Sequence, residues 1–380
     1  MWIDQQFDGG NITVIDCSNP QNIRLSIQQD NNAEFAQWFS FHLHEAKNTP
    51  VTMIIENAGQ CSYPSGWKEY SVRHSVDGSV WNCTPTRYED GKLIIEHQPL
   101  SSLVRYAYFA PYSWSRHQNI LQYADRHGAL LRHLGCSVEG RPITEIQIGH
   151  GSKHIWIVAR QHPGETMAQW WAEGFLSRLL KDGEPTSKLL KQLATIHIVP
   201  NMNPDGSVHG NLRTNAKGVN LNRVWNNPNV EHEPEVFYVR KRMKETGVFL
   251  CIDVHGDEGL PYNFFAFPWG IPSLSKKQER DFERLSELMC FVSPEFQAEY
   301  GYPKPKPGKG HPGVCSCWVA EFFSCIAVTL EQPFKDNKIL PDPKVAWSPQ
   351  RAAMFGAASV QTLYLFFKER TSSQTQGSPT

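Results

Sequence analysis

A histidine and a glutamate lie three positions apart where an apolar run gives way to a helical pattern. His162 and Glu165 share this tight turn, so their imidazole and carboxylate can point toward the same metal ion. An isolated His-x-x-Glu is common, however, and it also describes a capped helix start whose glutamate stabilises the helix dipole. The same spacing recurs at His255 and Glu258. The pair therefore needs a further ligand before it predicts a metal site.

His255 is the best candidate for that ligand. It follows the apolar run 248–254, which we predict to be a strand. If this strand and the strand before His162 are parallel, both histidines lie at the same edge of the sheet. A catalytic zinc ion takes three protein ligands and keeps one position open, and two histidines with one carboxylate are a known set. The sequence thus predicts a zinc site, and a histidine satisfied locally by the backbone is the alternative.

The stretch 201–225 begins where a predicted strand ends and is dense in Asn, Gly and Arg. This composition makes a poor core element, so we expect a functional loop. Its Arg213 and Arg223 can form bidentate hydrogen bonds to a carboxylate or a developing oxyanion, a geometry that lysine cannot reproduce. Two surface arginines are the alternative interpretation.

Glu331 directly follows the apolar run 326–330. A carboxylate at the end of a buried strand can lie at the mouth of a cleft. A raised pKa near the metal would let it take a proton from the bound water, whose own pKa falls to about 7 on zinc. A solvated strand end is the alternative, and Glu258 competes with Glu331 as base or ligand.

These residues require buried strands that end at one edge of a sheet. After residue 115 the sequence alternates apolar strand patterns with helical patterns, which is typical of α/β proteins. We expect an α/β/α domain with a mixed central β-sheet over 115–370. Its strands are predicted at 154–160, 195–200, 248–254 and 325–330. Its helices are predicted at 115–134, 167–180, 233–246 and 275–290.

Residues 1–114 follow a different pattern, with short strand-like runs between turns such as Asp90-Gly91. They predict a small all-β, sandwich-like N-terminal domain. The runs lie at 11–15, 51–56 and 92–96, and 105–114 is expected to be a last strand and connector. The segment 371–380, rich in Ser, Thr and Gln, predicts a disordered tail.

The composition is that of a folded enzyme-sized protein. The 380 residues are 40% hydrophobic and 20% charged, which favours two domains. The net charge is -1 without a basic block, so nucleic acid is not an expected partner. We expect no membrane partner, since the sequence shows neither a signal pattern nor a membrane-spanning apolar run. Nine cysteines without framework spacing suit reduced thiols, and we expect a cytoplasmic protein.

Five short motifs, taken together and in order, resemble the zinc carboxypeptidase family. They are His-Pro-Gly-Glu at 162–165, Asn-Pro-Asp-Gly at 203–206, Asn-Leu-Asn-Arg at 220–223, His255 and Thr-Leu-Glu at 329–331. The β-rich start, the segment 105–114 and Leu-Gly-Cys-Ser-Val-Glu-Gly-Arg at 134–141 look like the cytosolic carboxypeptidase branch. The resemblance is to a deglutamylase-like, short member of bacterial type, and it covers the chain up to the tail.

The resemblance implies a metal site and a base. His162, Glu165 and His255 would hold one Zn²⁺ per chain. Glu331 would act as general base toward the bound water and then as proton donor to the leaving amine. The chain would be a zinc exopeptidase, with its catalytic domain at 115–370.

The resemblance also implies how the substrate binds. Arg213 would stabilise the oxyanion, while Asn222 and Arg223 would grip the C-terminal carboxylate of a peptide or protein. A fixed distance between clamp and zinc would restrict hydrolysis to the last peptide bond. Family members also present a tyrosine from a mobile loop, and Tyr300 or Tyr302 would serve here.

The choice of terminal residue follows only by analogy. Glutamate-removing members of the branch use a basic residue, but the corresponding region 311–320 contains no Lys or Arg. Lys304, Lys306 and Lys309 lie just before it. Removal of C-terminal glutamate is therefore an expectation, beside hydrolysis of another amide, such as an N-acyl amino acid or a cell-wall peptide. A binding protein that has lost catalysis is a further alternative. The oligomeric state is left open.

The segment from Phe41 to Glu45 alternates in the manner of a strand and places His42 and His44 on one face. No further ligand lies near it in sequence, so we interpret it as a strand face rather than a metal site. The domain around it shows no motif of its own. Its expected role is to pack against the catalytic domain or to narrow access to the cleft.

Overall fold

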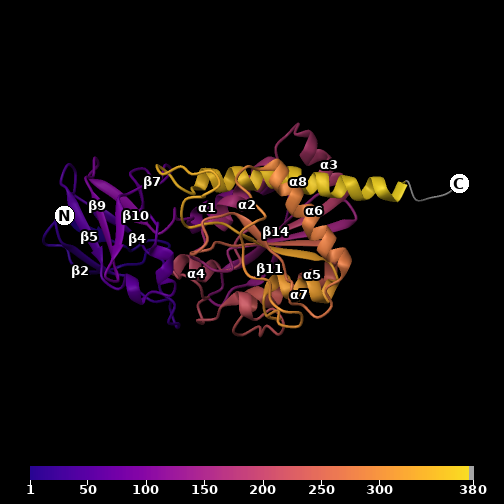
Figure 1. Ribbon diagram of the computed structural model, residues 1–380, viewed down its shortest axis with the longest axis horizontal. Helices are drawn as coiled ribbons and strands as arrows, with labels where there is room; N and C mark the ends of the chain where they lie inside the picture. The colour runs from indigo at the N-terminus through magenta and orange to yellow at the C-terminus, as the bar shows by residue number, and fades with distance from the viewer. Residues whose placement is uncertain (376–380) are drawn as a thin grey trace.

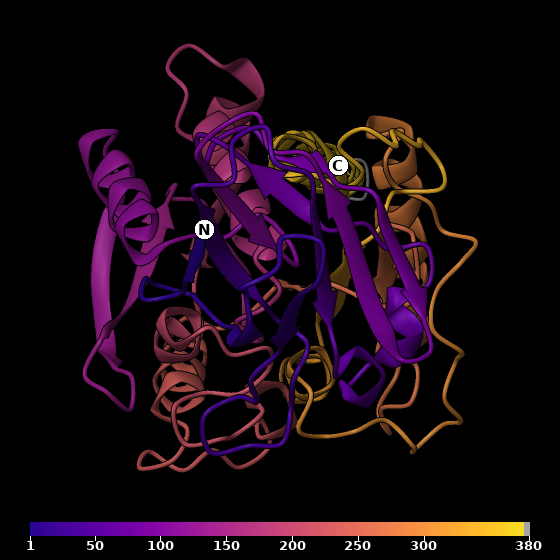
Figure 2. The same ribbon diagram turned by 90° about the vertical axis from the view of Figure 1, so that its left-hand side faces the viewer.

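The computed structural model describes residues 1–375. Figure 1 shows a β-rich part at the N-terminal end of the molecule and a larger part, with helices around a sheet, at the other end. Seen from the N-terminal end, the strands of the β-rich part lie in front of the larger part (Figure 2). The predicted fold class, an all-β region followed by a mixed α/β region, is confirmed.

The β-rich part consists of two five-stranded sheets. The first has the order β1 (Trp2–Asp4), β4 (Ser40–His44), β10 (Leu103–Ala107), β6 (Arg73–Ser75) and β7 (Asn82–Cys83). The second has the order β2 (Thr13–Asp16), β3 (Ile23–Ser26), β5 (Val51–Ile55), β9 (Lys92–His97) and β8 (Thr86–Glu89). Alternate residues such as Leu43, Met53 and Ile95 are fully buried in one hydrophobic core, as expected where each sheet turns one face inward. Two short 3-10 helices follow β5, η1 (Ala58–Gln60) and η2 (Pro64–Trp67).

The larger part is built on a seven-stranded mixed sheet. Its order is β11 (Leu130–Cys136), β12 (Pro142–Ile148), β14 (Ala194–Val199), β13 (Lys153–Ala159), β15 (Leu250–Val254), β17 (Ile326–Glu331) and β16 (Phe264–Ala266). The four neighbouring strands β14, β13, β15 and β17 run parallel to one another. The pairs β11–β12, β12–β14 and β16–β17 are antiparallel. The central parallel strands are buried almost throughout, which explains their continuous apolar runs.

Helices cover both faces of this sheet. One face packs against α2 (Met167–Leu179), α3 (Pro185–Leu193), α6 (Lys276–Val292) and the long α8 (Pro349–Thr375), which Figure 1 shows in yellow. The other face packs against α5 (Pro234–Thr246) and α7 (Cys315–Phe323). Strand β13 shows the division, because Ile155 and Ile157 lie in one core while Trp156 and Val158 lie in the other. Across residues 1–375 no helix combines the length and the apolarity that a membrane crossing requires.

Three further helices complete the larger part: α1 (Trp114–Arg126) and the shorter α4 (Pro204–His209) and η3 (Leu221–Arg223). The predicted helix 115–134 is wrong in its second half. The chain turns at Gly128, whose φ of 79° suits glycine, and Leu130–Cys136 pairs with β12 as an edge strand. Pairing with a distant strand overrides the local helical pattern here. We propose that the domain boundary lies at 114/115.

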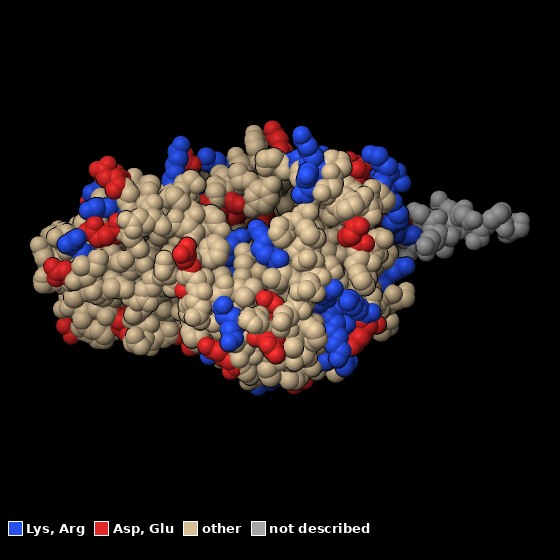
Figure 3. All heavy atoms as spheres, turned by 90° about the horizontal axis from the view of Figure 1, so that it is seen from below, with Lys and Arg blue, Asp and Glu red and all other residues tan. Residues whose placement is uncertain are grey.

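The C-terminal end also differs from the expected boundary. Helix α8 continues to Thr375, five residues into the segment 371–380 that the sequence predicts as a disordered tail. The other five residues of that segment, 376–380, lie outside the described residues. Basic and acidic side chains are interspersed over the face seen in Figure 3, in keeping with the balanced composition.

Candidate active site

The candidate residues lie at the carboxyl ends of three neighbouring parallel strands. Strands β13, β15 and β17 are adjacent and in parallel register. His162 lies in the turn after β13, His255 follows β15, and Glu331 ends β17. In an open α/β sheet, ligands bind outside the carboxyl ends of the strands. The expected meeting of the three side chains at one edge is therefore observed.

His162, Glu165 and His255, which we name the cleft cluster, converge on one point. Each carboxylate oxygen of Glu165 lies 2.7 Å from an imidazole Nδ1, Oε1 from that of His162 and Oε2 from that of His255. The two Nδ1 atoms are 3.2 Å apart. A tetrahedral zinc ion with bonds of about 2.0 to 2.1 Å separates its ligands by about 3.3 Å. Two nitrogens and a carboxylate at such spacing, all at most 4% exposed, fit a bound zinc ion.

The outer nitrogen of each imidazole has its own partner. His162 Nε2 lies 3.0 Å from Asn220 Oδ1, and His255 Nε2 lies 3.0 Å from Asp253 Oδ1. Gln161 holds Asp253 in turn, since its Nε2 donates to both carboxylate oxygens at 2.8 Å. Such partners set the tautomer of a metal-binding histidine and strengthen it as a ligand. They leave the Nδ1 atoms free to face inward.

The charges in the cleft cluster are those of a cation site. Burial, together with the positive charge of Arg213, lowers the pKa of His162 to about 4. Burial alone would raise the pKa of Glu165, but His162 and His255 hold it well below its usual value. Burial alone would lower the pKa of His255, but the carboxylates of Asp253 and Glu165 raise it well above its usual value. A metal ion at this point would take the place of the proton on His255.

Local structure holds the turn that carries His162 and Glu165. Arg160, the first residue after β13, has a φ of 59°, in the left-handed region that non-glycine residues seldom adopt. Its buried guanidinium donates to the backbone oxygens of Pro163 and Tyr112 and to the side chain of Gln169. These bonds offset the strain and give the turn one shape, as is common at functional sites.

Two of the sequence motifs have a structural role beside the site. Asn203 caps α4 by accepting from the Gly206 N–H, and its Nδ2 donates to the backbone oxygen of Gln161 at 3.0 Å. Asp205 accepts hydrogen bonds from Ser137 Oγ and from Arg141 Nη1, both at 2.7 Å. The segments 203–206 and 134–141 are therefore bound to each other and to the residue before His162.

Two buried glutamates face the cleft beside the cleft cluster. Glu331 is 7% exposed, and within residues 1–375 its Oε2 has no hydrogen-bond partner. Burial raises its pKa well above the usual value. Glu258 is also 7% exposed, and burial with the charge of Glu165 raises its pKa to about 8. Both glutamates are placed to exchange protons in the cleft, so the alternative noted from sequence persists.

Arg213 lies between the two parts of the chain. Its guanidinium lies 5.5 Å from the ring centre of Tyr63 and 5.8 Å from that of Phe35. Burial alone would lower its pKa, but Tyr63 and the nearby carboxylates, Glu165 foremost, raise it. Arg213 is therefore a permanent cation beside the cleft cluster.

Asp30 of the β-rich part holds the loop that carries Arg213. Its Oδ2 accepts from the backbone N–H of Arg213 at 2.8 Å and from the N–H and hydroxyl of Thr214, both at 2.9 Å. Sequence reasoning missed Asp30, and it also missed Tyr63 and Ser65, which line the cleft. These residues are far from the motifs in sequence and carry no local signal.

The two residues expected to bind a terminal carboxylate also line the cleft. Asn222 Oδ1 accepts from the backbone N–H of Cys315 at 2.8 Å, and its Nδ2 lies 3.2 Å from His255 Nε2. Arg223 is more exposed, and its Nη1 donates to the backbone oxygen of Asn222 at 2.7 Å. The fold thus fixes the Asn222 side chain through contacts with its neighbours, and it leaves most of the Arg223 guanidinium N–H groups available to a substrate.

The cleft has a volume of about 1330 Å³. Both candidate tyrosines line it, with the Tyr302 hydroxyl donating to Asp257 and the Tyr300 ring stacked on Tyr262 at 4.7 Å. Lys304 also lines it, with its ammonium 3.7 Å from the ring centre of Trp269.

Of the other lysines noted from sequence, Lys309 belongs to the cleft lining and Lys306 lies outside it. The hydroxyls of Ser316 and Thr329 lie 3.0 Å apart on the cleft wall. The structure therefore supplies both positive charge and neutral polar groups along the space that a substrate would fill.

Comparisons with known proteins identify the family of this chain. A family model described as zinc carboxypeptidase matches residues 118–344, and one described as the cytosolic carboxypeptidase N-terminal domain matches residues 3–109. An uncharacterized protein of Zymomonas mobilis is 43% identical over 93% of both chains. Cytosolic carboxypeptidase 2 of Xenopus tropicalis is 28% identical over 67% of this chain, which corresponds to 30% of the longer frog protein.

Solved structures match the whole architecture. A metallo-carboxypeptidase of Burkholderia cenocepacia is 42% identical with a TM-score of 0.93, over 97% of this chain and 99% of that one. A metallo-carboxypeptidase of Pseudomonas aeruginosa, solved in complex with (2-guanidinoethylmercapto)succinic acid, is 39% identical with a TM-score of 0.95. That match covers 97% of this chain and all of the other. The chain therefore belongs to the zinc carboxypeptidase family, as a metallocarboxypeptidase with the N-terminal domain of the cytosolic carboxypeptidases.

Proposed function

We propose that this chain is an exopeptidase that hydrolyses the last peptide bond of peptides or proteins, with one zinc ion held by His162, Glu165 and His255. The observation that carries the proposal is the spacing of the cleft cluster, whose donor atoms lie 2.7 to 3.2 Å apart. Beside them lies a buried carboxylate oxygen, Glu331 Oε2, that has no hydrogen-bond partner among the described residues. Zinc would lower the pKa of a water to about 7 and polarise the scissile carbonyl group.

The protein's own groups move the protons. Glu331 Oε2 is free to accept a proton from the attacking water as the water oxygen bonds to the carbonyl carbon. The same carboxyl group then gives that proton to the amine nitrogen as the carbon–nitrogen bond breaks. Its raised pKa suits both steps, because the group must bind the proton and release it within one reaction.

The arginines supply fixed positive charge. Arg213 lines the cleft and would compensate a negative charge on the carbonyl oxygen, and its surroundings keep it protonated. Arg223, with Asn222 beside it, would bind the free carboxylate at the end of the substrate through its guanidinium fork. A clamp at a set distance from the cleft cluster accounts for hydrolysis at the chain end only.

We infer a preference for an acidic terminal residue, glutamate in particular. Lys304 and Lys309 line the cleft and would attract a second carboxylate, which supports this preference. The Pseudomonas relative binds a succinic acid derivative, a dicarboxylate by its chemistry, which is in keeping with carboxylate recognition at this site. The derivative also carries a guanidino group, so a basic terminal residue is the competing candidate.

The test is amino acid release from peptides that differ only in their C-terminal residue, each with and without a zinc chelator. A matched peptide ending in an amide removes the free carboxylate and should resist hydrolysis. Chelator-sensitive release of glutamate would support both the reaction and the preference. Release of another residue would contradict the preference alone, whereas cleavage of the amide-ended peptide or of N-acyl amino acids only would contradict the exopeptidase assignment.

The lysines offer a test of the preference. Lys304→Gln should raise KM for a glutamate-ended peptide by about 5-fold to 10-fold, since a charge-assisted contact is worth about 1 kcal/mol or more. Lys306→Gln is the matched control, because Lys306 lies outside the cleft lining in the same segment. Equal effects of the two substitutions would remove Lys304 from substrate recognition.

A further inference from the structure

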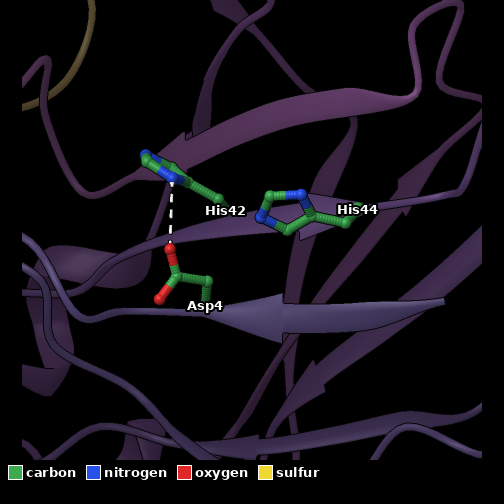
Figure 4. A group of neighbouring side chains, drawn as sticks. All are labelled: Asp4, His42 and His44. Atoms are coloured by element: carbon green, nitrogen blue, oxygen red, sulfur yellow. Dashed lines mark ion pairs between the residues drawn. The ribbon is translucent and has the colours of Figure 1, made fainter.

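A second group of two histidines and a carboxylate lies on the β-rich part, as Figure 4 shows. His42 and His44 belong to β4, and Asp4 belongs to β1. The two strands pair antiparallel, with Asp4 opposite His42 and Trp2 opposite His44. Alternate residues of paired strands share one face. The ligand that the local sequence lacked therefore arrives from the neighbouring strand, and we name Asp4, His42 and His44 the sheet cluster.

The donor atoms of the sheet cluster are within reach of one ion. One ligand atom from each residue lies within 4.8 Å of the others, and Asp4 Oδ2 is 3.8 Å from His42 Nδ1. Ligands of a tetrahedral zinc ion lie about 3.3 Å apart, so the donor atoms need to approach one another by up to about 1.5 Å on binding. All three residues are half-buried, which leaves room for water as a further ligand.

The surroundings hold these side chains in place. The ring of Trp2 stacks on His44 at 3.7 Å and 3°, and the ring of Phe7 stacks on His42 at 4.0 Å and 8°. The backbone N–H of Gln6 donates to Asp4 Oδ1 at 2.8 Å, so Oδ2 is the oxygen that faces His42. The sheet cluster is therefore organised in advance of any ligand, which favours binding.

A buried nitrogen without a partner points to a missing ligand. Within residues 1–375, His44 Nε2 is buried and has no hydrogen-bond partner. Figure 4 shows one ring nitrogen of His44 directed toward Asp4 and His42. A buried nitrogen without a hydrogen bond destabilises the fold. A metal ion would satisfy it, because the His44 imidazole, the His42 imidazole and the Asp4 carboxylate can all bind the same ion.

One positive charge lies beside the sheet cluster. Arg105 of β10 is opposite His42, but its Nη1 donates to the backbone oxygen of Val76 at 2.7 Å. The carboxylate of Asp4 offsets part of the effect of this charge on His42. The N-terminal amine forms an ion pair with Glu45 at 3.5 Å.

We propose that Asp4, His42 and His44 bind a second divalent ion of the zinc class, which ties the edge strand β1 to β4. Imidazole and carboxylate donors suit zinc and its transition-metal neighbours. Strand β1 has only three residues, so a metal link between it and β4 would add to a short run of sheet hydrogen bonds. The role is structural and separate from hydrolysis.

The test counts metal ions per chain in untagged protein after dialysis against buffered Zn²⁺, by mass spectrometry of the metal. The intact chain should hold two ions. His44→Gln should hold one, His162→Ala should hold one, and the double variant should hold none. His97→Gln is the matched control, since His97 and His74 form another imidazole pair in the same part, with ring centres 4.4 Å apart and hydroxyl partners instead of a carboxylate.

Asp4→Asn is a second variant that keeps the shape of the side chain. It tests the proposal even where His44→Gln fails to fold. In the His162→Ala background, Zn²⁺ should raise the melting temperature by about 3 °C or more, and Asp4→Asn or His44→Gln should abolish that rise. An unchanged ion count and an unchanged rise in both variants would overturn the proposal. A loss only on His162→Ala would assign all bound zinc to the cleft, whatever the outcome for hydrolysis, and would equally overturn it.

Discussion

The cleft cluster and the sheet cluster each contain two histidines and one carboxylate, glutamate in the first and aspartate in the second, yet the fold positions them differently. In the cleft cluster the donors lie 2.7 to 3.2 Å apart in turns that follow parallel strands. In the sheet cluster they lie up to 4.8 Å apart on the face of an antiparallel pair. A turn can aim side chains at one point, whereas opposite residues of paired strands keep a spacing of about 4.5 to 5.5 Å between their Cβ atoms.

The surroundings separate the two clusters further. The cleft cluster has Glu331, Glu258 and Arg213 beside it in a cleft of about 1330 Å³. The sheet cluster is packed against the rings of Trp2 and Phe7. A reaction needs a base, a compensating charge and room for the substrate, in addition to an ion. The comparison teaches that ligand type alone does not distinguish a reactive site from a structural one.

The largest expected effect is the difference in kcat/KM between a variant of the cleft cluster and a variant of the sheet cluster. His255→Ala should lower kcat/KM by about 10⁴-fold or more, because it removes a donor from the ion that the reaction requires. His44→Ala should leave kcat/KM within about twofold, since it alters a distant and independent site. Initial rates with zinc-saturated protein measure both. Similar losses in the two variants would break the comparison.

The next effect tests the base. Glu331→Gln should reduce kcat by about 10²-fold to 10⁴-fold and leave two ions bound, because only the proton acceptor is lost. Glu258→Gln, the matched control at equal burial, should cost far less. Ion counts and kcat on the same samples decide the matter. A larger loss from Glu258→Gln would transfer the base role to that residue.

A smaller effect should come from the contact between the two parts of the chain. Asp30→Ala removes the acceptor of the Arg213 and Thr214 hydrogen bonds, so the loop should shift and kcat/KM should fall by about 10-fold to 100-fold. Glu34→Ala, an exposed neighbour, serves as control.

Asp30→Asn retains an acceptor oxygen, so it should recover part of the activity that Asp30→Ala loses. An Asp30→Ala variant with full activity and an unchanged melting temperature would show that the β-rich part does not position Arg213. The role of Asp30 is positioning, because it acts through the loop rather than on the substrate.

The smallest expected effect concerns the other imidazole pair. Burial and the neighbouring His74 lower the pKa of His97 to about 4. The unfolded chain, with a pKa of about 6.5, therefore binds more protons between these values, and the stability that neutral His97 provides is lost as pH falls from about 6.5 to 4.

In metal-free protein, the free energy of unfolding should fall as the pH is lowered from 7 to 5. In His97→Gln this fall should be smaller by about 1 kcal/mol, a value that allows for the partial exposure of His97. Urea unfolding at the two pH values measures it. An identical loss in both proteins would mean that His97 does not titrate as its burial implies.

Much of the fold was predictable because its signals are local. The apolar runs at 154–160, 195–200, 248–254 and 325–330 correspond to β13, β14, β15 and β17 within two residues at each end. Buried parallel strands must be apolar on both faces, so their sequence alone reveals them. Strand β11 was missed because it is an edge strand with half-exposed, helix-compatible residues.

The sequence by itself determined which chemistry this protein can perform. The residue types at 162, 165, 255 and 331 and their places directly after apolar runs were enough to predict an edge with two histidines and two carboxylates. The tertiary structure alone decided which distant residues join them. Asp30 reaches the Arg213 loop, and Asp4 lies beside His42, because of strand pairing and domain contact. Register between strands depends on packing across the whole sheet, and local periodicity does not encode it.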